Sequence, residues 1–176
     1  VVYQEFNLLP DLTVAENMFV GDLPRGRFAG YSARRAEALA TGLLQRLGST
    51  LDPSRLVSEL TVAEQQVVEI GAALALDAQV IIMDEPSTVL ASDELGVLHD
   101  VVHRLRAEGR GVVYISHRLD EVLRLADRVT VFKDGEHVCT APTSEMSHDR
   151  LINTMIGRDL VDLFPDRVAP SRGALL

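Results

Sequence analysis

Two adjacent acidic residues, Asp84 and Glu85, follow a run of four apolar residues, and Pro86 comes directly after them. The apolar run is typical of a buried strand that Pro86 would end. In an open parallel sheet, ligands bind beyond the carboxyl ends of the strands, where these acids would lie. One carboxylate there can bind Mg²⁺, and its neighbour can orient or deprotonate a water molecule. A turn that carries two solvated acids is the alternative, and the pair alone does not decide between them.

The second half of the chain alternates β-branched runs with helical patterns, which predicts an α/β fold with a parallel sheet and crossover helices. Strands of such a sheet are expected to be buried on both faces. A tight turn at Asp134-Gly135 predicts a hairpin after the third run. The expected strands are 80–83, 111–115, 128–132 and 136–140, and the expected helices are 92–108, 118–125 and 144–156.

Val1-Val2-Tyr3 reads like a strand entered midway, and the rest of the first half of the chain shows helical patterns. Thr13-x-x-Glu16 is a capping box, in which each side chain binds the other residue's free backbone N–H, so residues 13–20 are expected to form a short helix. A long helix is predicted over 61–76. An amphipathic helix is predicted over 32–47, with a buried stripe made of Ala36, Leu39, Leu43, Leu44 and Leu47.

Composition excludes several classes of function. The formal net charge is -9, from 17 basic and 26 acidic residues, and no run of Lys or Arg forms a cationic stripe. Nucleic acid is therefore not an expected partner. The single Cys139 excludes an internal disulfide and any cysteine-cluster zinc site. No apolar run approaches the roughly 20 residues that a membrane-spanning helix needs.

Four further features flank the acid pair in a fixed order. Gln4 lies in "VYQEFN", "LTVAE" opens the long helix, "STVLASDE" follows the acids, and His117 ends the next strand in "VVYISHRLDEV". With these features the chain resembles the ATP-binding subunits of ABC transporters, and among them the sugar importers of the ribose, galactose and xylose type. The resemblance covers nearly the whole chain. Each motif is modest, but together, in order and at plausible spacing, they are specific.

This resemblance implies a P-loop NTPase-like core that binds ATP and Mg²⁺. Asp84 is similar to the Walker B aspartate that holds the metal, and Glu85 to the general base. Gln4 resembles the Q-loop glutamine, which contacts Mg²⁺ and the attacking water. His117 resembles the H-loop histidine that contacts the γ-phosphate. Ala91 falls on the D-loop, where many relatives carry a polar residue.

The segment Leu60-Thr61-Val62-Ala63-Glu64 takes the place of the family's signature sequence, which acts on nucleotide held by the opposite domain. A helix N-terminus suits phosphate, because its free N–H groups carry partial positive charge. Thr61 keeps the usual hydroxyl, whereas Val62 and Ala63 replace two glycines. Glu64 puts a negative charge close to the expected anion and could weaken its binding. Thr61 and Glu64 also form a capping box, which requires no ligand.

The phosphate-cradling motif G-x-x-x-x-G-K-[ST] does not occur in the chain, so the Walker A region is missing from it. The resemblance then implies an N-terminally truncated part of the first of two nucleotide-binding domains. We expect a partial domain at 1–157, with a helical subdomain at about 11–75, and a linker at 158–176. Because the P-loop supplies much of the phosphate binding, the isolated chain is expected to hydrolyse little or no ATP.

The resemblance also implies partners: a second nucleotide-binding domain, in cis or in a homodimer, transmembrane permease subunits and, indirectly, a solute-binding protein. The expected location is the cytoplasmic face of the membrane. A relative that acts on ribosomes or DNA is one alternative, and a non-enzymatic scaffold, favoured by Glu64 and Ala91, is another. His99 and His103 have the i,i+4 spacing of a helical zinc site, but Asp100 replaces the usual Glu and no third ligand is evident.

Overall fold

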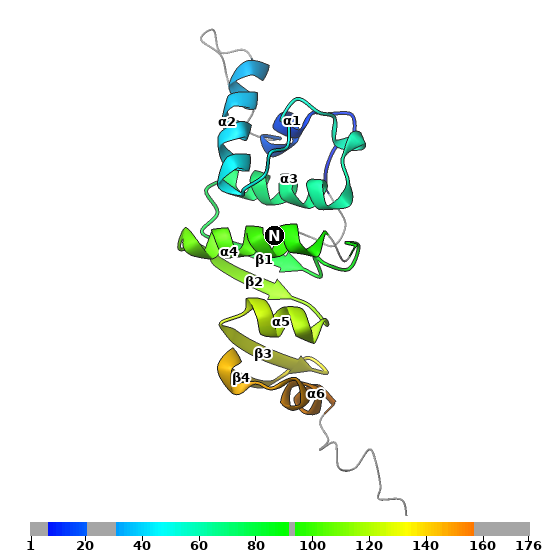
Figure 1. Ribbon diagram of the computed structural model, residues 1–176, viewed down its shortest axis with the longest axis vertical. Coiled ribbons are helices and arrows are strands. Elements are labelled where there is room, and N and C mark those ends of the chain that lie inside the picture. The colour runs from blue at the N-terminus through cyan, green and yellow to red at the C-terminus, as the bar shows by residue number, and fades with distance from the viewer. Residues whose placement is uncertain (1–6, 21–30, 92–93, 157–176) are drawn as a thin grey trace, which may run out of the picture. The chain divides into compact units, whose positions relative to one another are not determined.

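The structure is a computed structural model that describes residues 7–20, 31–91 and 94–156 (Figure 1). The chain divides into two compact units, residues 1–125 and residues 126–176. Gln4 and the predicted linker lie outside the described residues, and the predicted domain boundaries stay predictions. In the described part, no helix combines the length and the apolarity needed to cross a membrane.

The first unit opens with three packed helices: α1 (Val14–Met18), α2 (Ala33–Arg46) and α3 (Val62–Ala75) (Figure 1). A 3-10 helix, η1 (Val57–Glu59), precedes α3. Both predicted capping boxes are present, and the three predicted helices are confirmed. The prediction of a buried stripe on α2 is wrong at one residue. Leu39 is 46% exposed, whereas Ala40 is fully buried, because the helix turns the row of 36, 40, 44 and 47 inward.

Gly71 lets α1 approach α3 closely. A Cβ atom at this position would lie 2.6 Å from the Cε atom of the buried Met18, whereas a Cβ at Gly42 of α2 would meet nothing within 4 Å. We expect Gly71→Val to lower the free energy of unfolding by about 2 kcal/mol through overpacking. Gly42→Val is the matched control, with a change close to zero. Equal effects of the two substitutions in chemical denaturation would contradict this account of the packing.

A parallel strand pair forms the rest of the first unit. β1 (Val80–Asp84) pairs with β2 (Gly111–Ile115), and α4 (Leu95–Ala107) connects them and packs against β2 and α3. The short α5 (Leu119–Leu125) follows β2 and contacts α4. The predicted parallel sheet with a crossover helix is confirmed. Burial on both faces is wrong for β2, where Val113 and Ile115 are 47% and 46% exposed.

The second unit is a hairpin followed by a helix. β3 (Arg128–Lys133) pairs antiparallel with β4 (Glu136–Pro142) through Asp134 and Gly135, whose φ angles of 51° and 81° suit a two-residue hairpin turn. The 3-10 helix η2 (Thr143–Glu145) and α6 (His148–Ile156) complete the unit. The hairpin prediction is confirmed. The third run was also expected in the parallel sheet, and the partner described for it is β4.

Candidate active site

The register of the parallel strands brings the acid pair and His117 to one edge of the sheet. Asp84 is opposite Ile115, and the Glu85 backbone N–H donates a hydrogen bond to the Ile115 carbonyl at 2.9 Å. His117 follows two residues later. Its Nδ1 atom lies 2.9 Å from Glu85 Oε1 and 2.8 Å from Oε2. Two side chains 32 positions apart in the sequence therefore form a direct pair.

Glu85 has an unusual backbone conformation, with a φ angle of 49°. A non-glycine residue in this left-handed region costs energy, and such residues concentrate at functional sites. The turn that follows holds the residue in place. The Thr88 N–H donates to the Glu85 carbonyl at 3.1 Å, and Thr88 Oγ1 donates to Glu85 Oε2 at 3.2 Å. The carboxylate is thus fixed by His117 and Thr88, and its side chain stays 23% exposed.

Asp84 is the last residue of β1 and is partly buried. Its carboxylate makes no hydrogen bond or ion pair with the described residues. A hard oxygen donor left without a protein partner at the carboxyl end of a parallel strand suits a divalent cation such as Mg²⁺. The residue present at this position therefore fits the metal that the sequence predicts.

The predicted signature segment forms a well-capped start to α3. Glu64 accepts a 2.8 Å hydrogen bond from the Thr61 N–H, and Thr61 Oγ1 accepts one of 3.3 Å from the Glu64 N–H. Arg55 lies 3.1 Å from the other Glu64 oxygen and neutralises its charge. Leu60 and Ala63 are buried. The negative charge that the sequence placed beside the expected anion therefore has a cationic partner in the chain itself.

Val62 is partly buried and packs against the hydrophobic core that contains Leu60 and Ala63. Its packing accounts for an apolar side chain where the family often has glycine. Thr61 is the exposed residue at this helix start. Ala91 is also exposed, and its N–H donates to the Glu94 carboxylate at 3.0 Å, ahead of α4. No contact among the described residues joins Thr61 or Ala91 to the Glu85–His117 pair, so their roles stay predictions.

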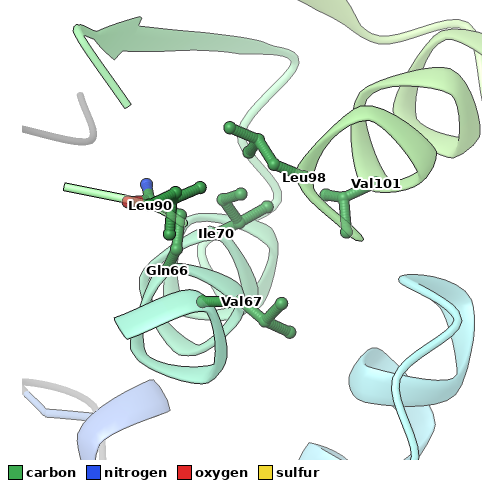
Figure 2. Close-up of a pocket in the computed structure, with 7 residues that line it drawn as sticks. Gln66, Val67, Ile70, Leu90, Leu98 and Val101 are labelled. Atoms are coloured by element: carbon green, nitrogen blue, oxygen red, sulfur yellow. The ribbon is translucent and has the colours of Figure 1, made fainter. Parts of the chain in front are cut away.

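A buried contact links α3 to the loop after the acid pair (Figure 2). Gln66 of α3 lies beside Leu90 of that loop and is 3% exposed. Its Nε2 atom has no hydrogen-bond partner in the part of the chain that the structure describes. The other residues around this spot are apolar: Ala63, Val67, Ile70, Leu98 and Val101. The contact joins the helix of the predicted signature to the predicted D-loop.

Histidines on α4 do not form a metal centre with other ligands. Among the described residues, no group of three or more His, Cys, Asp or Glu side chains could hold a metal ion. His99 is buried in α4, and burial lowers the pKa of its imidazole. The neutral form of His99 is therefore favoured at neutral pH, as suits a histidine packed in the core.

Comparison with known proteins identifies the family. The ABC transporter family matches residues 1–88, half of the chain. The chain is 54% identical over 166 residues to the Ribose import ATP-binding protein RbsA 3 of Rubrobacter xylanophilus, covering 94% of this chain and 33% of that protein. It is 48% identical over 176 residues to RbsA 3 of Rhizobium meliloti, covering 100% of this chain and 34% of that protein. The chain belongs to the ABC transporter family.

Solved structures agree with this assignment. A nucleotide-free ATP-binding cassette from an ABC transporter matches with a TM-score of 0.65 and 25% identity, over 87% of this chain and 62% of that one. A second ATP-binding cassette matches with a TM-score of 0.72 and 25% identity, over 89% and 66%. The predicted α/β cassette fold is confirmed. The chain spans about a third of the length of the curated relatives it matches.

Proposed function

We propose that the protein containing this chain hydrolyses ATP to energise the import of a small solute, a monosaccharide, through separate membrane subunits. The Glu85–His117 pair, at the ends of two adjacent parallel strands, is the observation that carries this proposal. The relatives named ribose import ATP-binding proteins support it, and they do not favour the scaffold alternative.

Glu85 acts as the general base in this proposal. Water attacks the γ-phosphorus, its proton passes to the Glu85 carboxylate, and the bond to the β-phosphate oxygen breaks to release ADP. His117 pairs with Glu85 through Nδ1, which leaves its Nε2 atom for a phosphate oxygen. Asp84 would hold Mg²⁺, which neutralises phosphate charge when bound.

The remaining predicted residues act around this centre. Gln4 would contact the metal and the attacking water. The segment Leu60, Thr61, Val62, Ala63 and Glu64 would bind nucleotide held by a second nucleotide-binding domain, with the start of α3 facing phosphate. Its capping box supports this role, because a well-ordered helix start keeps its remaining N–H groups in a fixed direction. Ala91, on the loop that follows the acids, would lie at the contact between the two domains.

The proposed partners are permease subunits in the membrane and, through them, a solute-binding protein. The protein would be peripheral, at the cytoplasmic face of the membrane. Magnesium-dependent release of phosphate from ATP by the intact protein is the experiment that tests the enzymatic part. A protein that binds its membrane subunits but shows no such hydrolysis would overturn it.

Glu64 offers a test of the predicted signature segment. Glu64→Gln keeps a capping side chain and removes a negative charge beside the expected anion, which also releases Arg55. We expect the KM for ATP of the intact protein to fall about two- to threefold at low salt, with a smaller change at higher salt. Glu37→Gln is the control, since it removes an equal charge from α2, whereas Arg55 pairs with Glu64 and Glu59. A KM that is unchanged or higher in Glu64→Gln would contradict the placement.

A further inference from the structure

A buried polar network lies behind the Glu85–His117 pair. Tyr114 of β2 donates a 2.9 Å hydrogen bond to Glu121 Oε2, and Arg118 Nε lies 2.9 Å from Glu121 Oε1. Glu121 is 4% exposed although it carries a carboxylate. A carboxylate this deeply buried is costly unless it is paired. Here Oε2 accepts the hydrogen bond from Tyr114, and Oε1 has the charge of Arg118 beside it but no hydrogen bond of normal geometry.

Residues of this network lie on both sides of His117 in the sequence. Tyr114 lies three residues before His117 and is the next-to-last residue of β2, and Arg118 directly follows His117. Glu121 of α5 binds both neighbours. The path of the chain through His117 is therefore held from two sides by one carboxylate.

Ser87 is a buried residue in the loop of the acid pair. It lies two residues after Glu85, is 1% exposed, and its Oγ atom makes no hydrogen bond of normal geometry in the described part. Burial raises the pKa of the Tyr114 phenol, Glu121 acts in the same direction, and the neighbouring Ser87 hydroxyl opposes it. Tyr114 therefore stays protonated and donates to Glu121.

We propose that Tyr114 and Glu121, with Arg118, are positioning residues that hold His117 in register with Glu85 for hydrolysis. The inference rests on the proposed ATPase function. None of the three side chains belongs to the Glu85–His117–Thr88 contacts themselves. They act by fixing the backbone on either side of His117, so they determine how often the base and the histidine meet in the working geometry.

The test uses Tyr114→Phe in the intact protein, because this change removes one oxygen atom and keeps the packed ring. We expect kcat for ATP hydrolysis to fall about tenfold, with the KM for ATP unchanged within about twofold, since the network does not touch nucleotide. Glu121→Gln is a second variant, which removes the charge and keeps the shape, and the same split is expected. Thermal unfolding is recorded for each variant.

Tyr31→Phe is the matched control. It also removes a tyrosine hydroxyl that binds a carboxylate, that of Glu16 at 3.3 Å, but in the helical part of the first unit. The inference is wrong if Tyr114→Phe keeps the wild-type kcat, or if Tyr31→Phe lowers kcat equally. Wild-type hydrolysis that does not depend on Glu85 would instead overturn the proposed function, so the two failures are distinguishable.

Discussion

Replacing Glu85 by glutamine in the intact protein is expected to lower kcat for ATP hydrolysis by about a hundredfold or more, with ATP binding retained. The amide cannot accept the proton of the attacking water, yet it keeps the size of the carboxylate and can still contact His117 and Thr88. Because hydrolysis would end the closed state, the variant should accumulate with ATP bound as a dimer of nucleotide-binding domains. Size-exclusion chromatography with nucleotide analysis measures this species.

Glu94→Gln is the control for this prediction. Glu94 is another carboxylate of the same connecting segment, and it accepts a hydrogen bond from the Ala91 N–H instead of contacting His117. Its replacement should leave hydrolysis within about threefold of the wild type, because a glutamine can still accept that bond. Undiminished hydrolysis in Glu85→Gln would remove Glu85 from the role of base.

Local features of the fold could be predicted from sequence. The capping boxes at Thr13 and Thr61 and the hairpin at Asp134-Gly135 were predicted and are present, because each depends on residues within a few positions of one another. The exposure of Leu39 on α2 and of Val113 on β2 depends on distant parts of the chain. A run of β-branched residues indicates a strand but not its neighbour.

In the candidate site, too, some residues could be predicted from sequence and others could not. Asp84, Glu85 and His117 were chosen from motifs and order, and the strand register brings the last two into contact. Thr88 and the network around Glu121 were missed. A glutamate four residues after a histidine gives no sign in the sequence that it will be buried beneath a tyrosine of the preceding strand. The only local signal was Tyr114, a polar group inside an otherwise apolar strand.

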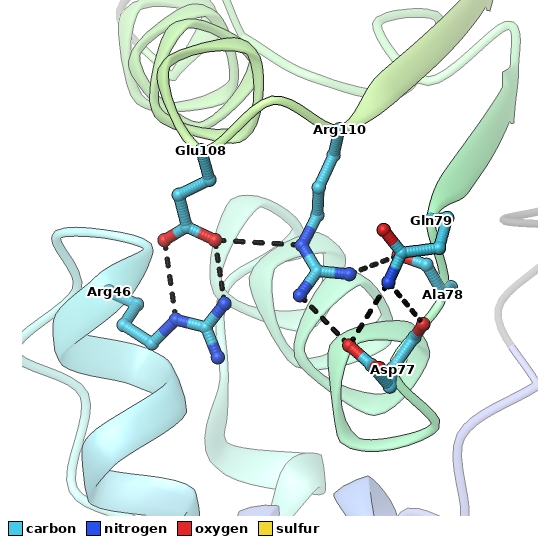
Figure 3. Close-up of polar contacts among 6 residues, drawn as sticks. All are labelled: Arg46, Asp77, Ala78, Gln79, Glu108 and Arg110. Atoms are coloured by element: carbon cyan, nitrogen blue, oxygen red, sulfur yellow. Dashed lines mark hydrogen bonds and ion pairs between the residues drawn. The ribbon is translucent and has the colours of Figure 1, made fainter.

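Replacing Arg110 by alanine is expected to destabilise the first unit by about 2 kcal/mol. The Arg110 side chain is only 10% exposed and joins the end of α4 to the loop before β1 (Figure 3). Its guanidinium donates to the Ala78 carbonyl and to Asp77 Oδ1, the latter at 3.2 Å, and its Nε atom lies 3.5 Å from Glu108 Oε2. Alanine would remove the donor to the Ala78 carbonyl, a charged partner of Asp77 and Glu108, and the packed stem. Chemical denaturation measures the loss.

Arg46→Ala is the matched control for Arg110. Arg46 also binds Glu108, at 2.6 Å, but its side chain is 42% exposed, so we expect its removal to cost about 1 kcal/mol or less. Equal losses from the two substitutions would contradict the importance given to burial and to the contacts with Ala78 and Asp77.

The same network predicts a pH dependence. The hydrogen bond from Arg46, with the charges of Arg46 and Arg110, lowers the pKa of Glu108 below its usual value of 4.5, against a smaller opposing effect of burial. A carboxylate with a lowered pKa in the folded state stabilises the protein above its unfolded pKa. This contribution is lost as the pH falls below 4.5 and through the folded pKa. In Glu108→Gln that part of the acid destabilisation should be absent.

ATP hydrolysis by the intact protein assembled with its permease subunits tests the central claim most directly. Phosphate release and uptake of a labelled monosaccharide are followed together in proteoliposomes, for the wild type and for Glu85→Gln. We expect magnesium-dependent hydrolysis that accompanies uptake in the wild type, and loss of both in the variant. The account would be contradicted if Glu85→Gln continued to take up the monosaccharide, or if it hydrolysed ATP as fast as the wild type.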